Sequence, residues 1–198
     1  MKDQRPGLRE RTRRAVQTEI SEAALTLFAE RGFEATTIDD IAAAVGMSQR
    51  SVFRYFATKE DIVIGQFGLV TDAMLDTLQA RPGEEPPWTT LRHTFEVFED
   101  QNHPGLTAPI SRLVFETPAL LAAYLQKLQS AQDAVSTALT DRATASGHPY
   151  RIDDPTPRVL TAAAFGCLVA AQYSWLASGA EGSFADAIDR AMAVIVPR

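Results

Sequence analysis

Apolar residues recur at spacings of three and four along most of the chain, which is the period of an α-helix that buries one face. The first stripe ends before Gly32, which suits the left-handed cap that closes a helix, and it consists of Val16, Ile20, Ala23, Ala24, Leu27 and Phe28. No alternation of polar and apolar residues is long enough to predict a strand. The pattern therefore predicts an all-α protein.

Three capping signals follow in close order and predict three further helix starts. Thr37 and Thr58 each precede an aspartate by three residues, Asp40 and Asp61, so a hydroxyl and a carboxylate can satisfy the first free N–H groups. Ser48 opens the segment QRSVFRYF as another N-cap.

The helix after Thr58 is expected to end near Ala80, before the breaker segment RPGEEPP. Five more helices are expected at residues 87–101, 105–116, 118–146, 155–179 and 183–196. No apolar run approaches the length of a membrane span, because Gly166, Gln172 and Ser174 interrupt the most apolar segment, so we expect a buried helix there. The prediction is nine helices in two domains, residues 1–62 and 63–198.

The segment DDIAAAVGMSQRSVFRYF predicts two short helices joined by a turn at Gly46, which is a helix-turn-helix. Ile41 is expected to face inward from the first helix, and Val52 and Phe56 from the second. The other side chains of the second helix then point outward. A nine-residue helix is ~13 Å long and fits a DNA major groove ~12 Å wide.

Charge is unevenly distributed along the 198 residues, of which 45% are apolar and 22% charged. Residues 1–60 carry ten Lys or Arg and nine Asp or Glu, whereas residues 61–198 carry nine and sixteen. Six basic residues fall within residues 1–18, namely Lys2, Arg5, Arg9, Arg11, Arg13 and Arg14. A basic head on an acidic body favours a polyanionic partner, and a solvated tail without a partner is the alternative.

Enzyme signatures are missing from the sequence. It has no Gly-rich phosphate loop, no Gly-x-Ser-x-Gly elbow, and no zinc-ligand spacing among His93, His103, His148 and Cys167. We therefore expect no catalytic residue, metal or cofactor. The N-terminus lacks the apolar core of a secretory signal, and Cys167 is the single cysteine, so a cytoplasmic protein is expected.

Residues 15–61 resemble the DNA-binding domain of the TetR (tetracycline-repressor-like) family of transcriptional regulators. The matching segment is AALTLFAERGFEATTIDDIAAAVGMSQRSVFRYFATKED, with Leu-Phe, Gly, Thr-Thr, Ile-Ala, Gly-x-Ser and Lys-Glu at the family's spacing. The resemblance implies a nine-helix, two-domain fold with a three-helix head and a C-terminal ligand-binding and dimerisation domain. It also implies a homodimer that binds a palindromic DNA operator and is released by a small-molecule effector. Repression is the family default, and an activator or a redox-responsive regulator using Cys167 is the alternative.

The resemblance implies a set of DNA contacts, transferred position by position. Base contacts are implied at the start of the recognition helix, where Arg can bind guanine and Gln can bind adenine. Contacts with backbone phosphates are implied at the other positions. The set is Thr36, Gln49, Arg50, Ser51, Arg54, Tyr55 and Lys59. Phe53 replaces the family's usual Tyr and cannot donate a hydrogen bond, so Arg54 is expected to replace that contact. A core position for Phe53, and an ion pair of Arg54 with Glu60 or Asp61, are the alternatives.

In the second domain, the dimer interface is expected at helices 155–179 and 183–196, which are rich in small residues. Arg112 is alone on an apolar helix, so we expect it to be buried beside an anionic partner, either Glu116 or a ligand group. The segment from Arg112 to Tyr124 resembles a subgroup with the mycofactocin-system regulator, which implies acyl-CoA-like ligands. The pocket candidates, each of which is alternatively plain core, are Phe67, Met74, Phe95, Phe98, Arg112, Phe115, Tyr124 and Phe165.

Overall fold

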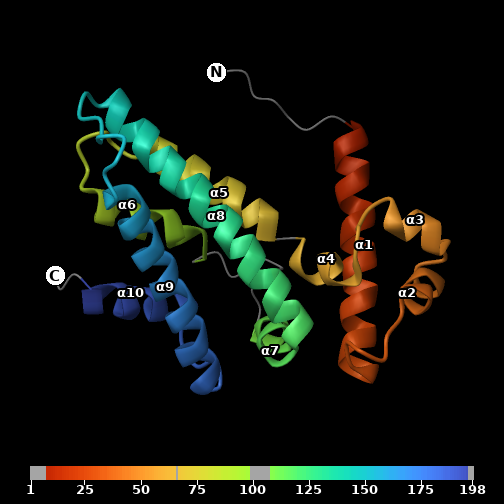
Figure 1. Ribbon diagram of the computed structural model, residues 1–198. Helices are drawn as coiled ribbons and strands as arrows, with labels where there is room; N and C mark the ends of the chain where they lie inside the picture. The colour runs from red at the N-terminus through yellow and green to blue at the C-terminus, as the bar shows by residue number, and fades with distance from the viewer. Residues whose placement is uncertain (1–7, 66, 99–107, 196–198) are drawn as a thin grey trace. The chain divides into compact units, whose positions relative to one another are not determined.

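The computed structural model describes residues 8–65, 67–98 and 108–195 (Figure 1). Over these ranges it contains ten α-helices, one 3-10 helix and no strand, which confirms the predicted all-α fold. The chain divides into two compact units, residues 1–65 and 66–198. Lys2, Arg5 and the predicted start of the helix at 105–116 lie outside the described residues.

The first unit is a small helical head in which three short helices pack with one long helix (Figure 1). The long helix carries its apolar stripe at every third or fourth position, and Ile20, Ala24 and Phe28 are buried on it. The rings of Phe28 and Phe33 pack at an angle of 54° to each other, with their centroids 5.0 Å apart. The helices are α1 (Leu8–Arg31), α2 (Ile38–Ala44), α3 (Gln49–Phe53) and α4 (Lys59–Ile64).

The predicted caps are present at all three short helices. The Thr37 hydroxyl accepts from the Asp40 N–H at 3.1 Å, and the Asp40 carboxylate accepts from the Thr37 N–H at 2.8 Å, which is a complete capping box. Hydrogen bonds from the Thr37 hydroxyl and N–H lower the pKa of Asp40. Ser48 and Thr58 accept from the N–H groups of Ser51 and Asp61 at 3.2 and 3.1 Å. Local sequence therefore fixes where these helices begin.

Two predicted helix lengths are wrong. Helix α3, the second helix of the predicted helix-turn-helix, has five residues rather than nine, although the Phe56 N–H still donates to the Val52 carbonyl at 3.1 Å. The helix expected from Thr58 to Ala80 is two helices, because α4 ends at Ile64 with Gly65 as its C-cap, and α5 (Phe67–Ala80) follows as a separate element. A methyl group at Gly65 would lie 2.5 Å from the Asp61 carbonyl oxygen, so this turn requires glycine.

The second unit is a bundle around the long helix α8 and the apolar helix α9 (Figure 1). The helix predicted at 87–101 is α6 followed by the 3-10 helix η1 within the described residues. Large buried side chains in the core include Leu78, Phe95, Leu139, Leu168 and Ile188. The elements after α5 are α6 (Pro87–Thr94), η1 (Phe95–Phe98), α7 (Ala108–Glu116), α8 (Pro118–Ala145), α9 (Thr156–Ala177) and α10 (Phe184–Ile195).

Helix α9 is long and apolar enough, by length and composition alone, to cross a membrane, contrary to the expectation that no segment qualifies. Its most apolar 18-residue window has a mean hydropathy of 1.5 and is 39% buried. The buried side includes Ala164, Phe165 and Leu168, which pack in the core of the second unit. A core helix of a globular domain meets the same criteria, so this feature alone is weak support for a membrane span.

Glu85 fixes the connection between α5 and α6. Its carboxylate accepts from Arg81 Nε at 3.0 Å and from the Thr90 hydroxyl at 2.9 Å, and Arg81 Nη2 binds its second oxygen. These bonds, the Arg81 pair first, lower the pKa of Glu85 to about 2. Arg142 on α8 donates to the carbonyls of Pro82 and Glu85, which holds the loop on the bundle.

Candidate functional site

The outward face of α3 carries the predicted base-contacting side chains. Val52 is fully buried on the inner face, and Gln49 and Arg50 are exposed on the outer face. Ser51 is half-buried, with its hydroxyl 2.9 Å from the Ser48 hydroxyl, so it belongs to the cap as well as to the outer face. Within the described residues no carboxylate pairs with Arg50. This short helix therefore presents uncommitted polar groups to solvent.

The ring of Tyr55, just after α3, lies close to Arg13 of α1 and to its own neighbour Arg54. The guanidinium carbons of Arg54 and Arg13 lie 5.3 and 5.8 Å from the centroid of its ring. Gln17 Nε2 on α1 donates to the Tyr55 carbonyl at 3.3 Å. The alternative ion pair of Arg54 with an acidic residue of α4 is not present in the structure. Two cations thus lie near one aromatic ring. The cluster of arginines near the N-terminus is the feature of the sequence that pointed to Arg13.

Phe53 is 46% exposed, so the alternative that placed it in the core is wrong. It lies three residues after Arg50 and four after Gln49, on the same side of α3. No ring contact or cation–π contact involves it in the part of the chain that the structure describes.

Thr36 is a correction to the predicted DNA contacts. Its side chain is fully buried, and its hydroxyl donates to the carbonyls of Gly32 at 2.9 Å and Leu27 at 3.4 Å. It therefore closes the end of α1 from inside the unit and has no hydroxyl to offer to a phosphate.

Lys59 also has a different role from the predicted one. Its ammonium donates to the carbonyls of Phe33 at 2.7 Å and Thr36 at 3.0 Å, and it lies 4.1 Å from the centroid of the Phe33 ring. The side chain thus ties the start of α4 to the α1–α2 turn. Because two of its three donors are used there, we treat Lys59 as a positioning residue and not as a phosphate contact.

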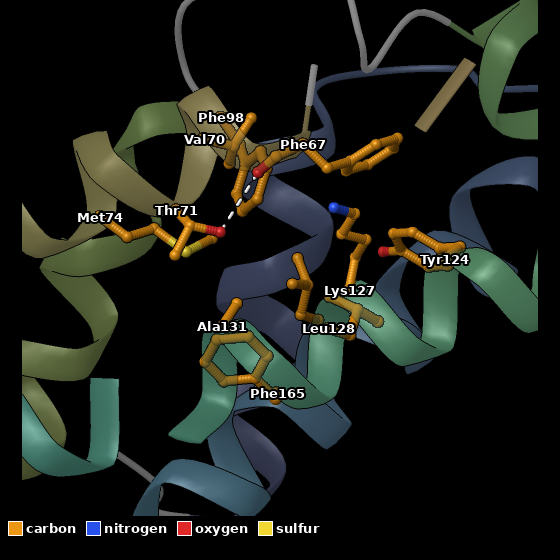
Figure 2. Close-up of a pocket in the computed structure, with 11 residues that line it drawn as sticks. Phe67, Val70, Thr71, Met74, Phe98, Tyr124, Lys127, Leu128, Ala131 and Phe165 are labelled. Carbon is orange, nitrogen blue, oxygen red and sulfur yellow. Dashed lines mark hydrogen bonds between the residues drawn. The ribbon is translucent and has the colours of Figure 1, made fainter. Parts of the chain in front are cut away.

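The second unit contains a narrow apolar pocket among α5, η1, α8 and α9 (Figure 2). Its cavity of about 20 Å³ has room for roughly one water molecule. Five of the predicted residues line it, namely Phe67, Met74, Phe98, Tyr124 and Phe165. The Tyr124 hydroxyl donates to Gln172 Oε1 at 2.5 Å, and burial raises the pKa of Tyr124.

Lys127 and Thr71 line the same pocket and were not predicted. The Thr71 hydroxyl donates to the Phe67 carbonyl at 3.2 Å, whereas Lys127 is exposed and pairs with no carboxylate among the described residues. Figure 2 shows the Lys127 amine turned toward the pocket beside Phe67 and Tyr124. Lys127 is the only lysine after Lys59 in the sequence, and this isolation is the one feature that could have marked it as a candidate site residue.

Three predicted pocket residues do not line the pocket. Phe95 is packed core, with its ring 5.6 Å from that of Phe165. Phe115 packs edge-on against Tyr173 with centroids 4.6 Å apart. Arg112 is exposed, so the inference of a buried arginine with an anionic partner is wrong, and no ion pair joins it to Glu116 in the described structure.

Helix α9 has a second, exposed face on the side away from the core. Val159 is 60% and Tyr173 is 52% exposed, and the small residues Ala162, Gly166 and Ala170 lie exposed between them. Cys167 is buried on the opposite side, and desolvation raises the pKa of its thiol. A buried thiol with a raised pKa is a poor redox sensor, which weighs against that alternative.

Known protein families match both units of the chain. Residues 20–64 match the family described as bacterial regulatory proteins, tetR family, and residues 67–198 match the MftR C-terminal domain. The chain is 32% identical over 145 residues to the HTH-type transcriptional regulator TcmR of Streptomyces glaucescens, a match that covers 69% of this chain and 64% of TcmR. It is 31% identical over 115 residues to the mycofactocin biosynthesis transcriptional regulator MftR of Mycobacterium tuberculosis, covering 57% and 58% of the two chains. The matched segments span less than two thirds of either relative.

The fold is also found among solved structures. The regulator FadR of Bacillus subtilis, determined in complex with stearoyl-CoA, superposes with a TM-score of 0.58 at 16% identity and covers 91% of this chain and 97% of its own. At this identity the likeness concerns the fold alone. The two family matches together cover most of the chain, and these families consist of regulatory proteins rather than enzymes. The chain therefore belongs to the TetR family of bacterial transcriptional regulators, with a C-terminal domain of the MftR type.

Proposed function

We propose that this protein is a ligand-responsive repressor whose homodimer binds a palindromic DNA operator in the cytoplasm and is released by a small-molecule effector. The observation that carries the proposal is the outward face of α3. Its inner side is buried at Val52, while Gln49 and Arg50 are exposed and unpaired within the described residues. Such a surface has no partner within its own unit.

The hydrogen-bond donors on and around α3 suit both the base edges and the phosphate backbone of a DNA duplex. Arg50 can donate two hydrogen bonds to guanine O6 and N7, and Gln49 can bind adenine N6 and N7 in the major groove. Ser51 adds a hydroxyl at the same end of the helix. Arg13 and Arg54, held beside Tyr55, are suited to backbone phosphates, which position a protein on DNA without reading its sequence.

A palindromic operator requires two heads related by a two-fold axis, with half-sites ~34 Å apart. The exposed face of α9 supports this arrangement, because Ala162, Gly166 and Ala170 would let a symmetry-related helix approach closely. Val194 and Ile195 at the end of α10 are 79% and 54% exposed and extend the apolar surface. We propose that α9 and α10 pair with their copies in a four-helix interface.

The pocket in the second unit is the proposed effector site. Its lining is almost entirely apolar, and Lys127 supplies its single charge. At about 20 Å³ the cavity is far below the ~300 Å³ of a typical ligand site, so an effector has to displace side chains to enter. A compound with an apolar body and an acidic group that reaches Lys127 fits this lining best.

The test is a titration of the full chain against the DNA upstream of its own gene, with a gel-shift or anisotropy readout. Arg50→Ala is expected to lose ~5-fold to 150-fold in affinity for each half-site, the value of one bidentate base contact, so the losses of the two half-sites multiply in the dimer. Arg151→Ala is the matched control, because Arg151 is exposed in the second unit and pairs only with Asp153. A reporter assay then separates repression from activation. Equal affinities of the two variants would contradict the proposed role of α3.

A further inference from the structure

Among the described residues of the first unit, Phe53 is the only exposed large apolar side chain. Its ring is 46% exposed, whereas Val52 before it and Phe56 after it in the sequence are buried. It has no ring partner and no cationic partner in the described residues. The head therefore has a hydrophobic group on its outer surface, where its own packing does not use it.

The position of Phe53 on α3 places it among the groups proposed to read bases. Residues three and four apart on a helix are neighbours, with Cβ atoms ~5–6 Å apart, so the ring lies beside both Arg50 and Gln49. Arg54, the next residue, turns instead toward the ring of Tyr55. The outer face of α3 thus combines a charged, an amide and an apolar side chain within one turn.

A phenyl ring has no donor or acceptor for a phosphate or for the polar edge of a base. The major groove offers one apolar group, the C5-methyl of thymine. Each base step rises ~3.4 Å along the duplex, so a side chain ~5–6 Å from Arg50 falls within about two base pairs of the base that Arg50 binds.

We infer that Phe53 packs on the C5-methyl group of a thymine and thereby specifies a T·A pair within two base pairs of the guanine bound by Arg50, in each half-site. The inference rests on the proposed function, because it requires α3 to lie in the major groove. It adds a residue that selects sequence through an apolar contact, beside the hydrogen-bonding residues.

The first experiment selects duplexes from a random-sequence library with the full-length protein. The wild type is expected to enrich a palindrome with one guanine and one neighbouring thymine per half-site. Arg50→Ala should lose the preference for the guanine, and Phe53→Ala the preference for the thymine alone. Ile152→Ala is the matched control, since Ile152 is an exposed apolar side chain in the second unit, and it should keep the full consensus.

The second experiment replaces each thymine of the selected duplex by deoxyuridine, which removes only the methyl group. Loss of one buried methyl contact weakens binding about 4-fold, and loss in both half-sites about 16-fold. Phe53→Ala should weaken binding to the thymine duplex by at least the same factor, and it should bind thymine and uracil duplexes equally, because the two changes remove one shared contact. Phe53→Leu should retain part of the discrimination.

The outcomes separate the inference from the function on which it rests. If no uracil substitution affects the wild type, or if Phe53→Ala responds to uracil as the wild type does, the thymine contact is wrong while Arg50→Ala can still lose affinity. If the wild type enriches no sequence at all, the proposed function fails and the inference with it. Circular dichroism of Phe53→Ala, whose substituted side chain is half exposed, shows whether the head is folded.

Discussion

Arg13 on α1 lies 5.8 Å from the ring centroid of Tyr55, at the end of the recognition helix. The contact joins two elements that are 42 positions apart, and Arg54 approaches the same ring at 5.3 Å. Two positive charges near one exposed ring favour an anion such as a backbone phosphate. We propose that the pair contacts a phosphate.

Arg13→Ala is expected to weaken binding to all duplexes to a similar extent. One lost phosphate contact in each half-site should reduce the slope of log affinity against log salt by about two units, without changing the selected sequence. Affinity measured at several salt concentrations tests this. Arg151→Ala, which removes an exposed arginine of the second unit, should leave the slope unchanged. An unchanged slope in Arg13→Ala would exclude the phosphate contact.

Lys59→Met should destabilise the head. The substitution keeps the apolar stem but leaves the carbonyls of Phe33 and Thr36 without their donor, which costs about 1–3 kcal/mol. Thermal unfolding followed by circular dichroism measures the loss. Lys127→Met is the control, because it removes an exposed lysine that pairs with no carboxylate among the described residues. Equal melting temperatures for the two variants would mean that the Lys59 contacts do not hold the α1–α2 turn.

Lys127→Gln should make the protein respond less to acidic effectors. Without the ammonium, the acidic group of a ligand loses its ion pair at the pocket, whereas a neutral ligand loses nothing. A panel of apolar carboxylates and their matching primary amides, tested for release of the protein from DNA, measures the difference. The wild type should prefer the carboxylates, and Lys127→Gln should not. If both proteins prefer the amides, the pocket does not select an acid.

Protonation of Glu85 in acid should make the second unit less stable, because it weakens the bonds of the carboxylate to Arg81 and Thr90. Its folded pKa of about 2 lies below the ordinary value of 4.5, so its contribution is complete above pH 4.5 and is lost as the pH falls toward 2. Solvent screens an ion pair near the surface, so the contribution is about 1 kcal/mol. Urea unfolding between these pH values should show a smaller pH dependence for Glu85→Gln than for the wild type. Parallel curves would remove Glu85 as a source of acid sensitivity.

The sequence predicted the elements whose causes are local. The hydroxyl caps at Thr37, Ser48 and Thr58 are predictable because they act within one turn, and each is present. The carboxylate bond that completes a capping box is present at Asp40, whereas at Thr58 the structure shows the hydroxyl cap alone. The break at Gly65 was missed because one glycine in an apolar run does not distinguish a helix end from a tolerated interior position.

Side-chain directions that depend on distant elements were not predictable in the same way. Lys59 matches a family position, but its ammonium reaches carbonyls 26 and 23 residues earlier, and no local pattern shows that contact. Arg112 stands in an apolar segment, yet its side chain is exposed, because it lies on the face of α7 that no other described residue of the unit covers. Lys127 lies beside the pocket, but its sequence context does not show this. A single lysine on a long helix is typical of a face exposed to solvent.

The measurement that tests the central claim most directly is a methylation-protection footprint of guanine N7 on the selected duplex. The wild type is expected to protect guanines in two major-groove patches whose centres lie ~10 base pairs apart, and Arg50→Ala should lose both. A single patch, no protected guanine in a duplex that the protein binds, or a footprint that Arg50→Ala leaves intact would contradict a two-fold pair of recognition helices in the major groove.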